Sequence, residues 1–244
     1  PEAIKNFWRW FGGSKVVDAE GRPLVVYHGT KSDFSTFEKG DLGFHFGTVE
    51  QTHIILNRRQ YSEGADSILP VYLKASNLVR LPDIGFNVPR ATIRALLEAG
   101  AISKEQAKEI GDEIGITFID TGSKEAMQQT LREELLKLGI DGIVYQNSGE
   151  ADRDSSGKLR DSYIVFNPSQ IKSAIGNAGS FSQSERSILK HAPKEKSVLD
   201  IPVSKEESTL DKIKASGKSN IDQFKAGSFD YVRQKLNDFR KSFA

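Results

Sequence analysis

Two stretches of sequence decide the fold: VVYHGT (residues 25–30) and SYIVFNPSQIKS (residues 162–173). Each is a short apolar run, rich in β-branched and aromatic residues, that ends in polar or turn-forming residues, which is typical of a buried strand. The first run carries the pair His28-Gly29 to its end, and the second begins just after a polar loop that contains acids. A histidine and an acid at the ends of strands that pair in one fold are candidates for a shared functional site.

The composition sets the broad class of the chain. Of its 244 residues, 37% are hydrophobic and 27% are charged, and the formal net charge is +1. These values are ordinary for a soluble protein and give no overall attraction to nucleic acid or membrane. The absence of cysteine excludes disulfides and thiolate metal sites, and fits a reducing compartment. No apolar run approaches the roughly 18 residues of a membrane span, and the start carries no signal-peptide pattern.

Residues 1–180 are interpreted as one mixed α/β domain, in which residues 88–115 form a helical insert. The insert and the segment 124–138 show apolar residues at helical spacing, and Gly139 ends the second helix. Expected helices span 7–11, 50–59, 88–115 and 124–138. Expected strands span 15–18, 23–27, 43–47, 69–74, 140–145 and 162–166, the first two forming a hairpin.

The composition changes toward the C-terminus, where serine, lysine and glutamate become frequent. We expect a linker over 181–207 and an amphipathic helical extension over 208–244. Because the chain begins at Pro1, without an initiator methionine, we expect a processed product or a piece of a longer protein. The extension is expected to pack on a further domain of that parent, although its basic residues leave membrane or nucleic-acid binding as an alternative.

Four motifs occur in an order that resembles a known family. They are WFGGSKVVD with PLVVYHGT (10–18 and 23–30), GFHFGT (43–48), GIDGIVY (139–145) and the run 162–173. Together they resemble an ADP-ribosyltransferase domain of the diphtheria-toxin and poly(ADP-ribose) polymerase type, closest to the domains of phage and mobile-element polyvalent proteins and toxins. The resemblance covers roughly residues 7–175. It implies an α+β fold with a split mixed β-sheet core, an NAD cleft between the two halves and peripheral helices.

The first motif supplies three expected NAD-binding residues. The resemblance implies that the His28 imidazole hydrogen-bonds the adenosine ribose of NAD, as part of the catalytic set. It also implies that the Gly29 backbone pairs with the nicotinamide amide, an approach that a missing side chain permits, while Thr30 supports the turn. The alternative is that His28 is a strand-end histidine whose ring is satisfied by a core carbonyl.

The second motif departs from the family pattern. His45 stands where many relatives carry a tyrosine that packs on nicotinamide, and we expect His45 and the following Phe46 to contact the cofactor. Protonated imidazole would oppose stacking on cationic nicotinamide, so binding is expected to depend on pH near about 6–7. The alternative is a cross-strand histidine at a half-exposed edge. A second expected tyrosine is replaced by Leu56, with Tyr61 nearby.

The catalytic acid also departs from the family pattern. Many relatives carry a glutamate one residue before the Tyr-Ile-Val strand, where this chain has Ser162, which is kept as a cofactor-binding candidate. A carboxylate is needed there because cleavage passes through an oxocarbenium-like state. We expect Glu150, on the preceding loop, to supply it. Asp161 is the second candidate, although alternation along the strand directs it to the opposite face; alternatively, the acids of this loop only solvate it.

Other polar residues are interpreted structurally. Gln170 and Lys172, in the closing Gln-Ile-Lys-Ser motif, are expected to lock the end of the last strand as a turn. His53 and His191 have no partners at ligand spacing, so no metal site is expected.

The leading hypothesis is a mono-ADP-ribosyltransferase that uses NAD as co-substrate and modifies a host macromolecule, as a phage or toxin-type effector. A host protein is the expected acceptor, and nucleic acid remains possible. The location is expected to be the virion or, after delivery, the host cytoplasm. The alternatives are an NAD glycohydrolase, which passes ADP-ribose to water, and a catalytically degenerate nucleotide-binding or structural module of a virion protein.

Overall fold

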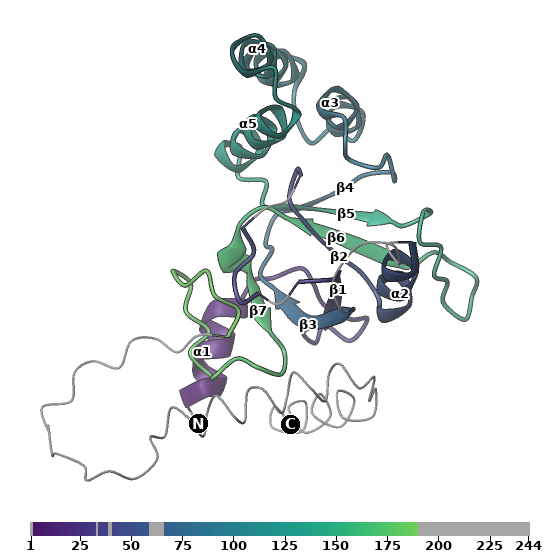
Figure 1. Cartoon of the computed structure of the whole chain (residues 1–244), viewed down its shortest axis with the longest axis vertical. Helices are drawn as coiled ribbons and strands as arrows, with labels where there is room; N and C mark the ends of the chain where they lie inside the picture. Colours follow the sequence, from purple (N-terminus) through teal and green to yellow (C-terminus); the bar gives the residue numbers. More distant parts are fainter. Residues whose placement is uncertain (1, 33, 39–40, 59–65, 190–244) are drawn as a thin grey trace, which may run out of the picture.

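The computed structural model describes residues 2–32, 34–38, 41–58 and 66–189, which form a mixed α+β domain built on two β-sheets. Figure 1 shows the sheets one above the other, with helices on the outer side of each. The predicted α+β fold with a split sheet is therefore confirmed.

The smaller sheet has three antiparallel strands in the order β1-β3-β7. They are β1 (Val26–Thr30), β3 (Ser67–Leu73) and β7 (Ile171–Ser173). The strand β1, which carries the His28-Gly29 pair, lies at the edge of this sheet. The pair lies within the strand rather than beyond its end.

The larger sheet has four strands in the order β2-β6-β5-β4. They are β2 (Phe44–Phe46), β6 (Asp161–Val165), β5 (Gly142–Gln146) and β4 (Leu78–Arg80). The pair β4–β5 is parallel and the others are antiparallel. This sheet is therefore mixed, as the resemblance implied, and β2 is one of its edges.

The two sheets meet where the edge strands β1 and β2 approach each other. Tyr27 and Gly47 form an isolated antiparallel bridge there, with backbone N···O distances of 2.9 and 3.0 Å. The split in the core thus lies beside this single bridge, and both histidine-bearing strands border it.

In the described part of the chain, five helices surround the sheets. They are α1 (Glu2–Phe11), α2 (Val49–Arg58), α3 (Pro89–Glu98), α4 (Lys104–Thr121) and α5 (Lys124–Lys137). In Figure 1, α3, α4 and α5 lie together beyond the four-stranded sheet, α1 lies beside β7, and α2 lies near β1. None of the helices in the described ranges is long and apolar enough to cross a membrane.

Alternation along the strands divides the buried residues between layers. Along β6, Tyr163 and Val165 face the space between the sheets, while Ile164 packs with the helical insert. Leu131 and Leu135 of α5 cover that outer face. A third cluster holds α1 on the smaller sheet, with Phe7, Trp10, Phe11, Val25, Tyr72, Ala174 and Phe181.

The helical insert has strong local start and stop signals. Ser103 begins α4 with a capping box, in which its side chain accepts from Gln106 N and the Gln106 side chain accepts from Ser103 N. Gly122 ends α4 with φ of 61°, in the left-handed region that glycine tolerates. The insert therefore continues to Thr121, beyond the expected end at residue 115.

Several expected elements are corrected by the structure. The hairpin over 15–27 is reduced to one bridge, Val17–Pro23, and the strand starts only at Val26. The short strand β4 was not expected, and β7 occupies the segment that was interpreted as a closing turn. Gln170 does lock that region: its Oε1 accepts from Phe166 N and Asn167 N at 3.0 and 2.7 Å.

The segment 181–189, which the sequence analysis placed in the linker, packs on the domain. Phe181, Ser187 and Ile188 are buried, and the Lys172 ammonium donates to the carbonyls of Glu185 and Ser187. Because Lys172 is buried, its pKa is lowered to about 8, although the Glu185 charge opposes this shift. The rest of the expected linker and the helical extension, including His191, lie outside the described residues.

Candidate active site

A large cavity lies where the edge strands β1 and β2 meet. Its volume is about 1400 Å³, and residues of β1, β2, α2, α5 and the 147–150 loop contribute to its wall. Most of the site residues expected from the sequence line it: His28, Gly29, Thr30, His45, Phe46, Glu150 and Ser162. Asp161 does not belong to this lining.

His28 lies on the cavity wall among aromatic rings. Its ring centroid is 5.0 Å from that of Phe37 and 5.5 Å from that of Phe46. Its Nδ1 is 2.8 Å from the backbone carbonyl oxygen of His45. Because a carbonyl oxygen can only accept, Nδ1 carries the proton in this bond. His28 thus has a carbonyl partner and lines the cavity, so features of both interpretations are present.

Gly29 has a packing reason to be glycine. A Cβ at this position would lie 2.9 Å from Thr52 Cγ2 and 3.1 Å from Leu56 Cγ, both on α2. The absent side chain thus lets α2 lie close against β1. Leu56, which replaces the expected second tyrosine, is buried in this contact, and Tyr61 lies outside the described residues.

Thr30 and His45 occupy the positions that their motifs suggested. The Thr30 hydroxyl accepts from Ser32 N at 3.0 Å, which supports the turn after β1. His45 lies in the middle of β2, opposite Ile164 of β6, and is half-buried at the cavity wall. This placement is compatible with both interpretations of His45, as a residue that contacts the cofactor and as a cross-strand histidine at an edge.

Ser162 belongs to a buried network of hydrogen bonds rather than standing free. Its hydroxyl donates to Gln51 Oε1 at 3.0 Å and accepts from Asn147 Nδ2 at 2.9 Å. Asn147 also donates to Glu150 Oε2 at 2.8 Å. The sequence analysis did not assign Gln51 or Asn147 to the site.

Glu150 is held from two sides at the cavity wall. Besides the Asn147 bond, Glu150 Oε1 lies 2.5 Å from Arg58 Nη1, and Arg58 Nη2 donates to the Gly149 carbonyl at 2.6 Å. The Glu150 side chain is 17% exposed and that of Arg58 is 56% exposed. A partly buried carboxylate is therefore presented to the cavity in a fixed orientation.

The loop before Glu150 is anchored by Asp83, which sequence reasoning missed. Asp83 Oδ2 accepts from Ser148 N and Ser148 Oγ, both at 2.9 Å, and from Gly149 N at 3.2 Å. Burial of the Asp83 carboxyl would raise its pKa, but these hydrogen bonds outweigh burial and the pKa is lowered. The local sequence offers only a Pro-Asp pair followed by Gly85, which is common in turns.

Tyr145 lines the same cavity from β5. Burial raises the pKa of its phenol, and the negative charges of Asp83 and Glu150 raise it further, while a hydrogen bond with Ser162 acts in the opposite direction. Tyr145 therefore stays protonated at neutral pH and can donate a hydrogen bond.

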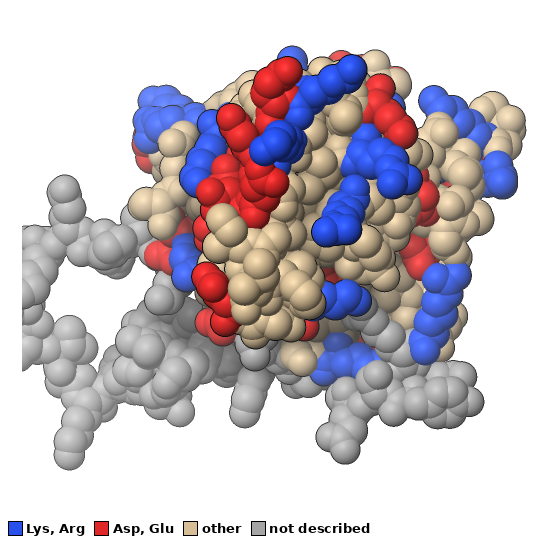
Figure 2. All heavy atoms as spheres, turned by 90° about the horizontal axis from the view of Figure 1, so that it is seen from above, with Lys and Arg blue, Asp and Glu red and all other residues tan. Residues whose placement is uncertain are grey.

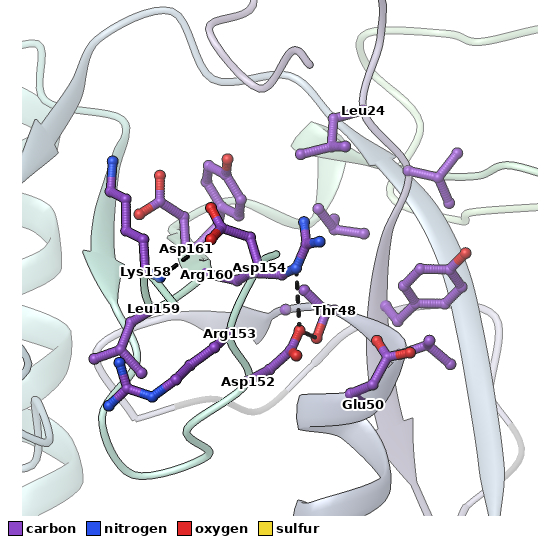
Figure 3. A pocket seen from close by; sticks show the side chains of 16 residues that line it. Leu24, Thr48, Glu50, Asp152, Arg153, Asp154, Lys158, Leu159, Arg160 and Asp161 are labelled. Atoms are coloured by element: carbon purple, nitrogen blue, oxygen red, sulfur yellow. Dashed lines mark hydrogen bonds and ion pairs between the residues drawn. The ribbon is translucent and has the colours of Figure 1, made fainter. Parts of the chain in front are cut away.

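Asp161 faces the other side of the sheet, as alternation along the strand indicated. Its carboxylate forms two hydrogen bonds with Arg80, at 2.9 and 2.7 Å. It lines a second pocket of about 540 Å³, shown in Figure 3, where Thr48 Oγ1 donates to Asp152 at 2.8 Å. Burial and the Asp161 charge raise the pKa of the neighbouring Tyr163 to about 12. The structure thus brings Glu150, and not Asp161, to the cavity with His28.

Helix α5 contributes a wall of the cavity that the sequence did not predict. Glu125, Gln129 and Arg132 of α5 line the cavity, at the spacing of one helix face. Figure 2 views the molecule from the insert side of Figure 1 and shows acidic and basic side chains interspersed on this surface. Among the residues that the structure describes, no three His, Cys, Asp or Glu side chains are grouped to hold a metal ion.

Comparisons with known proteins give one family match. A family model described as "ADP-Ribosyltransferase in polyvalent proteins" matches residues 18–181, which include all the cavity residues named above. No curated protein matches the chain. A solved structure described as "Crystal structure of an anti-CRISPR protein" is 10% identical, with 59% of this chain and 89% of that chain covered. Its TM-score is 0.27, too low to support an argument about fold or function.

Proposed function

The chain belongs to the family of ADP-ribosyltransferases in polyvalent proteins, and on this premise we propose that it cleaves the nicotinamide glycosidic bond of NAD and transfers ADP-ribose to a macromolecule. The observation that supports this proposal best is the position of the Glu150 carboxylate. Glu150 lies on the wall of the same cavity as His28 and His45, although Ser162 occupies the strand position of the usual acid.

The cavity has the chemistry that NAD requires. Its volume of about 1400 Å³ exceeds that of a typical small-ligand pocket, which leaves room for a dinucleotide. Aromatic side chains line it near His28, and the guanidinium groups of Arg58 and Arg132 can attract a diphosphate. These residues fit the proposed co-substrate.

In the proposed reaction, the bond between ribose C1′ and the nicotinamide nitrogen breaks. Nicotinamide leaves with the bonding electron pair, and positive charge develops on the ribose. The Glu150 carboxylate stabilises that charge and orients the ribose hydroxyl, because a fixed anion at a developing cation lowers the barrier. A nucleophile of the acceptor then bonds to C1′ and loses its proton.

We propose transfer of a single ADP-ribose to a host macromolecule, most simply a protein, by an effector that acts from the virion or in the host cytoplasm. Hydrolysis of NAD and binding of NAD without turnover are the two alternatives. Hydrolysis differs from the proposal in the fate of ADP-ribose, and binding without turnover differs in the absence of nicotinamide release, so one experiment separates all three.

The experiment incubates purified protein with NAD labelled in its adenylate phosphate, with and without host-cell extract, and measures nicotinamide release and labelled macromolecules. Wild type is compared with two isosteric variants, Glu150→Gln and Asp161→Asn. We expect label on a macromolecule with wild type and Asp161→Asn, and at least a 100-fold slower release with Glu150→Gln. Free ADP-ribose without labelled acceptor would identify a glycohydrolase, and NAD binding without release would refute both enzymatic functions.

A further inference from the structure

The chain of hydrogen bonds that ends at Glu150 runs in a direction fixed by the backbone. The N–H of Thr48 can only donate, and it donates to Gln51 Oε1 at 2.8 Å, so this oxygen is an acceptor. The Ser162 hydroxyl therefore donates its one hydrogen to Gln51 Oε1. Ser162 can then only accept from Asn147, which places the NH₂ group of Asn147, and not its oxygen, toward Ser162.

The opposite end of the Asn147 amide agrees with this direction. Asn147 Oδ1 accepts from Glu150 N at 2.7 Å, which a backbone N–H also fixes. One Nδ2 hydrogen is thus used for Ser162 and the other for Glu150 Oε2. Both ends of the amide are assigned by groups that can act in only one way, so a flipped amide would lose these bonds.

Resting on the proposed function, we propose that Asn147 is a positioning residue that holds the Glu150 carboxylate at the cavity wall. Asn147 thereby places the carboxylate of Glu150, which comes from the loop, next to the strand position that Ser162 occupies. Gln51, Asn147 and Ser162 are 1%, 3% and 2% exposed, so the support of the carboxylate is rigid and shielded from water. In this proposal, Ser162 holds the Asn147 amide in place through their hydrogen bond, and does not take part in the reaction itself.

The two ends of the Asn147 amide make different contacts, one with the loop backbone and one with the Glu150 carboxylate. The oxygen of Asn147 supports the loop through Glu150 N, whereas the NH₂ group orients the carboxylate. Asn147→Asp keeps the shape and the first contact, and replaces the donor that faces Glu150 by an acceptor. The variant thus removes the contact that orients the carboxylate, and sets a like charge beside it, while the contact with the loop backbone stays.

The experiment measures kcat for nicotinamide release and the Kd for NAD with wild type and Asn147→Asp. We expect kcat to fall about 100-fold, because displacement of a reacting group by about 1 Å has an effect of that size, while Kd changes less than about threefold. Asn77→Asp is the matched control, since Asn77 donates to the Gly139 carbonyl in an exposed turn outside the cavity lining. An unchanged kcat in Asn147→Asp would overturn the proposal.

A second variant covers the case in which Asn147→Asp does not fold. Ser162→Ala removes the anchor of the Asn147 amide, and we expect kcat to fall about 10-fold with little change in Kd. In the Glu150→Gln background, the further change at residue 147 or 162 should have no effect on kcat, because both act through the carboxylate. Additive losses would instead indicate a general structural role and overturn the proposal.

A spectroscopic measurement keeps this inference distinguishable from the proposed function. The side-chain amide protons of Asn147 should shift in a ¹⁵N-correlated NMR spectrum when Glu150 is changed to Ala. If they do not shift, Asn147 does not hold Glu150, whatever the activity. If they do shift but wild-type protein releases no nicotinamide, the proposed function fails while the contact is confirmed.

Discussion

Replacing Gly29 by alanine tests why glycine is needed beside the cavity. The added Cβ would lie 2.9 Å from Thr52 Cγ2 and 3.1 Å from Leu56 Cγ. Both side chains are buried on α2, so neither can turn into solvent. The change therefore pushes α2 away from β1.

The size of the effect follows from these distances. Carbon atoms in contact are normally about 3.5–4.0 Å apart, so the shorter distance is at least roughly 0.6 Å too small. Overpacking of this kind costs about 1–3 kcal/mol, and the loss of glycine flexibility in the unfolded chain offsets about 0.4–1 kcal/mol. These ranges leave a net loss between about 0 and 2.6 kcal/mol in the free energy of unfolding, and because both contacts are with buried side chains we expect about 1–2 kcal/mol. For a domain of this size, Tm should fall by roughly 2–8 °C.

The assay is urea unfolding of Gly29→Ala, compared with the double variant Gly29→Ala/Thr52→Ser, in which the close contact is removed. Serine removes the Cγ2 that the new Cβ meets and keeps the hydroxyl, which donates to the Thr48 carbonyl at 2.8 Å. The double variant should recover at least half of the lost stability. The packing argument is refuted if Gly29→Ala is as stable as wild type, or if Thr52→Ser gives no recovery. Weaker NAD binding at unchanged stability would instead support the nicotinamide contact.

Three further predictions concern support outside the cavity lining. Asp83→Ala should lower the free energy of unfolding by about 1–3 kcal/mol and slow nicotinamide release, because the loop that bears Glu150 loses its anchor. In urea titrations, the contribution of Asp83 should be present above about pH 4 and lost as pH falls through its lowered folded pKa. The pKa of Lys172 is lowered to about 8 in the folded protein, whereas it is about 10.4 in the unfolded chain. Between these two pH values the unfolded chain binds more protons than the folded protein, so the free energy of unfolding should rise with pH. Lys172→Met should not show this rise. Phe181→Ala should cost about 3–5 kcal/mol in thermal unfolding, whereas a linker residue would cost almost nothing.

The core strands could be predicted because their signals are local. The runs that contain Val26 and Ile164 combine β-branched residues with flanking turn residues, and each lies within a strand. The three-residue strands β4 and β7 were missed, whereas β2, of the same length, was expected because glycines flank its aromatic residues. Pairing with β5 and β3 is what defines β4 and β7. The packing of Phe181 was missed for a similar reason: its neighbours Phe7 and Trp10 lie at the other end of the chain.

The sequence by itself determined the family, the α+β class and the motifs that carry His28 and His45, because these depend on residue types in a fixed order along the chain; it also indicated the loop that carries Glu150. It also indicated, from the alternation along β6, that Asp161 and Ser162 face opposite sides. Only the tertiary structure decided what each group touches. Ser162 and Gln51 are 111 residues apart, and Glu150 and Arg58 are 92 residues apart. Hydrogen bonds across such separations depend on how the sheets and α2 pack, which local patterns do not encode.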